Sequence, residues 1–127
     1  MDKKIILILR VAVAIVFAQT LFFKFTAHPD SVYIFTKVGL EPYGRIGIGI
    51  LELISAILIL IPSTIWAGAL VALGIISGAI LMHLTILGIE INNDGGTLFF
   101  MAIGVFISSL IILWNQRKNI PFIGSKF

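Results

Sequence analysis

Four long apolar stretches, separated by short segments rich in Pro, Gly, Asn and Asp, run through the 127-residue chain. They extend over about residues 5–25, 43–61, 64–87 and 97–114. A helix that crosses a bilayer needs ~20 predominantly apolar residues, so each stretch is predicted to be a transmembrane helix. The short connection 62–64 leaves room only for a tight turn, which makes the second and third helices an antiparallel hairpin. The pattern predicts an all-α fold, an integral membrane four-helix bundle in one domain over residues 1–127.

The composition agrees with a membrane protein. Apolar residues make up 59% of the chain and charged residues only 12%, whereas ordinary soluble domains carry roughly 25% charged residues. The chain has no cysteine, which excludes a disulfide scaffold and a Cys-ligated zinc or iron–sulfur site. The net charge of +3 comes mostly from the two chain ends, so it indicates membrane topology rather than nucleic-acid binding. The lipid bilayer is therefore an expected partner, and nucleic acid is not.

Basic residues flank both chain ends and are missing from the connection 90–94. Those at the ends are Lys3, Lys4, Arg117, Lys118 and Lys126. Because basic residues favour the cytoplasmic side, both termini are predicted to be cytoplasmic. A signal peptide is the competing interpretation of the first stretch, but the run is too long, contains Arg10 and has no clear cleavage site.

The connection between the first two stretches, about residues 26–42, has an alternating polar and aromatic middle. Aromatic residues are enriched at the level of the lipid headgroups. The segment is therefore predicted to form a short interfacial helix, with Tyr33 and Phe35 at that level.

Five polar side chains lie within the predicted helices, where a charge at the centre costs ~2.5–3.5 kcal/mol on insertion scales. The candidate intramembrane polar site consists of Arg10, Gln19, Lys24, Glu52 and His83. Arg10 and Lys24 share one stripe of the first helix, and Gln19 lies on the opposite side from Arg10. We expect the stripe with Arg10 and Lys24 to face the bundle. The alternative for both cations is that their long stems carry the charges to the two membrane interfaces.

Glu52 lies near the middle of the second helix, too deep for its short side chain to reach either headgroup layer. It therefore needs a partner or a proton. Counted along the helices, Arg10 lies about 7 Å toward the cytoplasmic side, while Gln19 and His83 lie about 6 and 10 Å toward the outer side. Glu52 is expected to pair at one of these two levels and not at both. A buried ion pair or hydrogen bond that only fixes helix packing is the structural alternative.

His83 shares a face of the third helix with Ala72 and Ile76, so it is expected to point into the bundle. An imidazole there can carry protons, hydrogen-bond a quinone-like carbonyl or bind a metal. A lone His without a second His or Cys nearby gives metal binding little support, so no metal is predicted; a His satisfied by one neighbouring helix is the structural alternative. Gly74 and Gly78 form a GxxxG pattern roughly opposite His83, which fits either a close helix contact or self-association of the chain.

The charged residues and one turn of the first half of the chain form a pattern that is typical of a known family. An Arg early in the first helix, Arg10, is followed by Lys24, by the turn Gly39-Leu40-Glu41-Pro42, and by Leu51-Glu52-Leu53 in the second helix. In these features the chain resembles the DoxX / DoxX-like family of small four-helix membrane proteins. The resemblance covers essentially the whole chain and is most specific over residues 39–61. It departs over residues 19–23, where the family often has glycines.

The resemblance implies a four-helix bundle in the cytoplasmic (inner) membrane of a bacterium. Members are associated with redox chemistry, among them a subunit of a thiosulfate:quinone oxidoreductase, and many have no assigned activity. Arg10, Lys24 and Glu52 match the charged positions of the family, His83 matches more loosely, and no cofactor motif accompanies them. A quinone is the candidate cofactor. Because the chain has no cysteine, thiol–disulfide chemistry would require a redox partner protein.

Three functions fit the sequence, and whether the chain is an enzyme stays open among them. The leading hypothesis is an accessory or quinone-interacting subunit of a membrane redox system. The second is a non-enzymatic interaction or assembly protein, whose charges hold the bundle together while the Gly74/Gly78 face binds partners or a second copy. The third, a small-solute or proton transporter, is weakened by the small number of helices and the lack of an evident repeat.

Overall fold

The computed structural model describes residues 2–126, and every regular element in that part of the chain is helical. Four segments are long and apolar enough to cross a membrane: Lys3–Phe25, Tyr43–Leu60, Pro62–Leu87 and Thr97–Asn115. The prediction of an all-α membrane four-helix bundle is confirmed, and the predicted spans agree with these bounds to within about two residues at each end.

The four long helices form a closed ring. They are α1 (Lys3–Phe25), α3 (Tyr43–Leu60), α4 (Ile65–Met82), which continues into the π-helical turn η2 (His83–Leu87), and α5 (Thr97–Asn115). The shorter elements are α2 (Pro29–Lys37) and the 3₁₀ turns η1 (Pro62–Thr64), η3 (Arg117–Asn119) and η4 (Gly124–Lys126). Along the ring α1 packs on α3, α3 on α4, α4 on α5, and α5 returns to α1.

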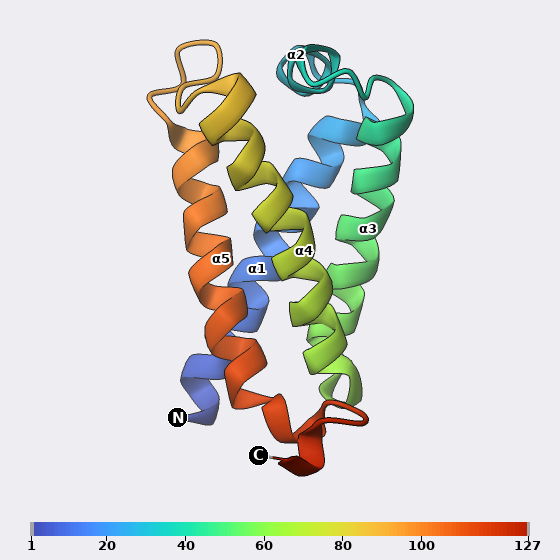
Figure 1. Ribbon diagram of the computed structural model, residues 1–127, viewed down its shortest axis with the longest axis vertical. Coiled ribbons are helices and arrows are strands. Elements are labelled where there is room, and N and C mark those ends of the chain that lie inside the picture. The colour runs from blue at the N-terminus through green and yellow to red at the C-terminus, as the bar shows by residue number, and fades with distance from the viewer. Residues whose placement is uncertain (1, 127) are drawn as a thin grey trace.

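The helices spread apart toward one end of the bundle. Figure 1 shows α2 lying across this end, which we call the α2 end, while the start of α1 and the end of α5 lie at the opposite end. At the α2 end α1 leans toward α3 and α4 leans toward α5, so that two helix pairs face each other. The apolar core, which includes Val13, Phe17, Ile59, Ala72 and Val105, has members from all four long helices.

The predicted hairpin is present, with η1 joining α3 to α4. Gly68 makes this contact possible, since a Cβ on Gly68 would collide with the backbone of Ile59. Ser55 Oγ donates a hydrogen bond to the carbonyl of Gly68 at 2.9 Å, which joins the two helices at the same level. Gly74 and Gly78 make no such contact, because a Cβ on either would have no atom within 4 Å among the described residues. Self-association through these two glycines stays a prediction.

The predicted short helix between the first two spans is α2, but only one of its two aromatic side chains lies as expected. Tyr33 is 38% exposed, whereas Phe35 is 9% exposed and packs inward. Residues two apart in a helix point in nearly opposite directions, so a helix lying flat over the bundle cannot present both to the headgroups. Asn92 Nδ2 donates to Asp30 Oδ1 at 2.8 Å and ties α2 to the connection before α5.

Candidate functional site

A cavity of about 590 Å³ lies between the two helix pairs and beneath α2, with lining residues from all five α-helices. Most of its wall is apolar. The polar residues on the wall are Gln19, Thr20, Lys24, Asp30, Ser31, Glu52, His83, Asp94 and Thr97. Binding pockets for small molecules typically measure ~300–1,000 Å³ and combine an apolar lining with a few polar groups. The cavity has the size and composition of such a pocket.

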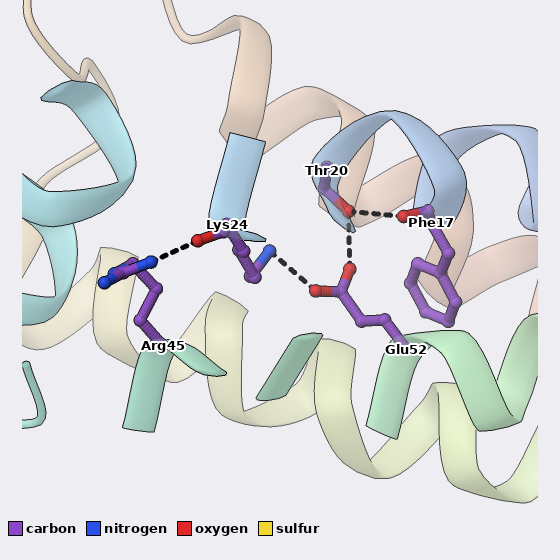
Figure 2. Close-up of polar contacts among 5 residues, drawn as sticks. All are labelled: Phe17, Thr20, Lys24, Arg45 and Glu52. Carbon is purple, nitrogen blue, oxygen red and sulfur yellow. Dashed lines mark hydrogen bonds and ion pairs between the residues drawn. The ribbon is translucent and has the colours of Figure 1, made fainter. Parts of the chain in front are cut away.

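Glu52 is the centre of a hydrogen-bonded cluster on one wall of the cavity (Figure 2). Lys24 Nζ lies 2.7 Å from Glu52 Oε1, and Thr20 Oγ1 donates to Glu52 Oε2 at 2.5 Å. The Thr20 hydroxyl also lies 3.2 Å from the Phe17 carbonyl, but it has one hydrogen, and the shorter contact is with Glu52. Glu52 is only 3% exposed. Its charge is therefore neutralised inside the bundle by Lys24.

The ion pair joins Glu52 to Lys24, and not to Arg10 or to the level of Gln19 and His83 as the backbone depths suggested. A helical side chain leans toward the N-terminus of its own helix. Because α1 and α3 are antiparallel, Lys24 leans into the bundle from the α2 end while Glu52 leans toward that end. Their side chains meet although their backbones lie at different depths, which a count of residues along each helix does not reveal.

Arg45, in the first turn of α3, holds the end of α1 that carries Lys24. Arg45 Nη1 donates to the carbonyl of Lys24 (Figure 2), and Arg45 Nε donates to Glu41 Oε1 at 2.8 Å. Arg45 is 7% exposed. Gly49, one turn further along α3, leaves the space that the Phe25 ring occupies. Sequence reasoning missed Arg45, although the i,i+4 spacing of Glu41 and Arg45 is a signal that could have pointed to it.

Arg10 and Gln19 do not join this cluster. Arg10 Nε donates to the carbonyl of Ile59 at 2.8 Å, and its Nη2 donates to the carbonyl of Leu60 at 3.0 Å. These carbonyls belong to the last turn of α3, which has no intrahelical donors left for them. Arg10 therefore acts as a cap for α3 at the end opposite α2. Gln19 is exposed and lies on the edge of the cavity.

His83 lies on the α4 side of the cavity, as its face with Ala72 and Ile76 predicted, and is 5% exposed. Its Nδ1 lies 2.8 Å from the Gly88 carbonyl, which can only accept, so Nδ1 carries a hydrogen. The ring packs edge-on against Phe99 at 5.4 Å between centroids. Nε2 is left to accept a hydrogen bond when the ring is neutral and to donate one when it is protonated. His83 also starts the π-helical turn η2, a distortion often found at functional sites.

The family model described as the DoxX-like family matches residues 8–107. The chain belongs to the DoxX-like family. The resemblance seen in the sequence is thereby confirmed, and the matched segment contains all five residues of the candidate polar site. No curated protein and no solved structure matches the chain.

In this DoxX-like protein the connection at the α2 end is organised around Asp94. Its Oδ1 accepts hydrogen bonds from the backbone N–H of Ile91 at 3.0 Å and of Gly96 at 2.8 Å, and its Oδ2 accepts one from Leu98 at 3.2 Å. Desolvation raises the pKa of the Asp94 carboxyl, but the hydrogen bonds from the backbone outweigh it and leave the pKa below its ordinary value. The carboxylate thus holds the start of α5 beside the cavity.

The DoxX-like protein has no metal-binding arrangement within residues 2–126, where no group of three or more His, Asp or Glu side chains is close enough to hold an ion. Two sets of polar side chains line the cavity from different helices. One consists of the ion pair of Lys24 and Glu52 with Thr20, and the other is the imidazole of His83.

Proposed function

We propose that this DoxX-like protein binds a quinone in the cavity beneath α2 and serves as an accessory subunit of a membrane redox system in a bacterial cytoplasmic membrane. The observation that carries the proposal is the cavity itself. Its volume of about 590 Å³ and largely apolar wall suit a ring with alkyl substituents, and Lys24 of α1 and His83 of η2 are among its polar lining residues. This is the combination that orients a small apolar ligand with two polar ends.

The residues on the wall fit the hydrogen-bonding needs of a quinone. Its two carbonyl oxygens accept hydrogen bonds, so the protein must supply donors from two directions. Lys24 Nζ has three hydrogens and directs one toward Glu52, which leaves donors for one carbonyl. When the ring is protonated, His83 supplies a donor at Nε2 for the other carbonyl, with its ring held by the bond from Nδ1 to Gly88.

A bound quinone would supply two-electron, two-proton redox chemistry. The chain's own side chains would then orient the ring and hold protons, at the Glu52 carboxyl on one wall and at His83 Nε2 on the other. The chain has no cysteine, so any thiol–disulfide exchange coupled to the quinone would need a partner protein. The proposed role is therefore accessory.

The test is binding of a tail-free benzoquinone to the purified protein in detergent, measured by calorimetry. We expect saturable binding to the wild type. His83→Phe keeps a flat ring but removes the hydrogen bond, and it should weaken binding about tenfold, as expected for a hydrogen bond to a charged donor. Lys37→Met is the matched control, since Lys37 is exposed on α2 and does not line the cavity. Absence of binding to folded wild-type protein would overturn the proposal.

One observation favours the non-enzymatic assembly function as the second candidate. Both carboxylate oxygens of Glu52 already have partners within the chain, in Lys24 and Thr20. If this cluster only joins α1 to α3, Glu52→Gln lowers the unfolding temperature in detergent while the wild type binds no quinone. Saturable binding that weakens in His83→Phe would instead support the redox role.

We also propose that both chain ends face the cytoplasm. Support comes from the basic residues at those ends and from the common end of the bundle at which α1 starts and α5 finishes (Figure 1). Because the chain has no cysteine, single cysteines report sidedness directly. A membrane-impermeant thiol reagent should label Asn93→Cys in intact cells, and Ser125→Cys only after the membrane is permeabilised. The reverse labelling would overturn the orientation.

A further inference from the structure

We infer that the ligand of the cavity is an amphiphile with a long apolar tail, which enters sideways from the bilayer and leaves its tail between α3 and α4 beside Gly74 and Gly78. The inference rests on the proposed function for the polar head. It adds the class of ligand and the route by which that ligand enters. A quinone with an isoprenoid or alkyl tail is such an amphiphile.

The cavity wall has a gap at the two glycines. Gly74 and Gly78 both line the cavity, and both are exposed on the outside of α4. A Cβ built on either residue would have no atom within 4 Å. The same two residues therefore belong to the cavity and to the surface that faces lipid, so the cavity opens sideways where their side chains are missing.

The other side of the cavity is lined by larger groups. On the face of α1 turned away from α3, the lining residues are Val16, Gln19 and Phe23, and α5 adds Leu98 and Met101. Side chains thus fill the cavity wall along α1 and α5, whereas no side chain fills the wall at the two glycines of α4. We therefore place the passage for a chain at Gly74 and Gly78, where no side chain fills the wall.

Buried polar groups indicate which end of the ligand goes inside. Glu52 is 3% exposed and His83 is 5% exposed, and both line the cavity. His83 Nε2 has no hydrogen-bond partner among the described residues, so it is free for a ligand head. Ile48 of α3 and Ile75 of α4, which line the cavity near the gap, are apolar. A polar head therefore fits inside, and an apolar tail fits the passage.

The passage acts by leaving space rather than by attracting the tail. A tail that moves from lipid to a protein groove gains no hydrophobic free energy, because both surroundings are apolar. A long polyisoprenoid chain also exceeds what a cavity of about 590 Å³ can hold together with a ring. The tail must therefore lie outside while the head is seated, and side chains at positions 74 and 78 would stand in its way.

The experiment compares a decyl-substituted benzoquinone with its tail-free parent on the double variant Gly74→Leu/Gly78→Leu. We expect the double variant to bind the decyl compound about tenfold more weakly than the wild type, and the tail-free compound within about twofold. Gly104→Leu is the matched control. Gly104 lies on α5, is exposed, has no atom within 4 Å of an added Cβ, and does not line the cavity, so this variant should bind both compounds as the wild type does.

The outcomes separate this inference from the proposed function. If the tail-free compound does not bind the wild type, the proposed function fails. If both compounds bind the wild type and the double leucine variant equally well, the passage at Gly74 and Gly78 is wrong while the proposed function stands. Gly74→Ala/Gly78→Ala adds only two methyl groups in open space, so it should fold even if the leucine variant does not. It should show a smaller loss for the decyl compound alone, and equal binding would again overturn the passage.

Discussion

Replacing Lys24 with methionine removes the cation beside Glu52 and keeps an unbranched side chain of similar length. Glu52 is 3% exposed, and its carboxyl would retain only the Thr20 hydroxyl at 2.5 Å. Removing one partner of a buried ion pair costs about 3–5 kcal/mol, because the other charge stays buried without compensation. The Lys24 side chain is 14% exposed, so some solvent or headgroup reaches the pair. We therefore expect Lys24→Met to lower the free energy of unfolding by about 3 kcal/mol.

The assay is unfolding in mixed micelles as the fraction of sodium dodecyl sulfate rises, followed by circular dichroism. Lys37→Met makes the same chemical change at an exposed position, where Nζ is 3.4 Å from the Tyr33 hydroxyl, and should stay within about 0.5 kcal/mol of the wild type. The double variant Lys24→Met/Glu52→Gln leaves no unpaired charge. It should lose less than the two single variants together, with a coupling of about 1–3 kcal/mol.

Two outcomes would contradict this role of the ion pair. If Lys24→Met unfolds within about 0.5 kcal/mol of the wild type and shows no coupling to Glu52→Gln, then the ion pair does not hold α1 against α3. A loss in Lys37→Met as large as in Lys24→Met would likewise show that removing any lysine is destabilising, and that the burial of this pair is not the cause.

Three further predictions concern Gly68, Arg10 and Asp94. Gly68→Ala should lower the free energy of unfolding by about 1–3 kcal/mol, because its methyl group collides with the Ile59 backbone. Gly47→Ala, where the methyl group enters open space, should be neutral or slightly stabilising in the same micelle assay. Arg10→Leu should cost about 1–3 kcal/mol by leaving two carbonyls at the end of α3 without their donors, and quinone binding by the folded fraction should not change. The pKa of the Asp94 carboxyl is lower in the folded protein than its unfolded value of 3.8, so its contribution to stability is fully present above 3.8 and is lost as the pH falls through the folded pKa. The rates of hydrogen exchange in the 90–96 connection should therefore differ between the wild type and Asp94→Ala at neutral pH and become equal only below this range. Equal rates at neutral pH would contradict the role of the carboxylate.

The positions of the spans could be predicted from the sequence because each membrane helix must be predominantly apolar over its own length. The bounds of α1, α3, α4 with η2, and α5 follow from local hydropathy and from turn-forming residues. The need of Glu52 for a partner could also be predicted, since an unpaired charge near the middle of a membrane helix is costly. The identity of that partner, Lys24, could not be predicted from the sequence. It depends on the directions in which the side chains of two antiparallel helices lean.

Thr20 and Gly68 make structural contacts that were not predicted from the sequence. Thr20 lies one turn before Lys24 on the same face, so the pair could have been identified as a common site for one carboxylate. Gly68 is less conspicuous than the GxxxG pattern of Gly74 and Gly78, yet it alone of the three makes the tight helix contact. A glycine pattern indicates where two helices can approach each other closely. In this protein the close approach occurs at Gly68, near the α3–α4 turn, and not at Gly74 and Gly78.

The two cations that lie within the apolar span of α1 have their partners on α3. Arg10 binds the carbonyls of the last turn of α3, and Lys24 binds Glu52. A ribosome makes α1 before α3, so α1 enters the bilayer while neither cation has a partner. The two positions lie toward opposite ends of α1, where long stems reach the headgroups and make separate insertion tolerable. When α3 arrives, both charges move from lipid to protein. Because α1 is made first, its two charges gain protein partners only when α3 packs against it. The packing of α3 on α1 is thus the step that brings α1 into the folded bundle.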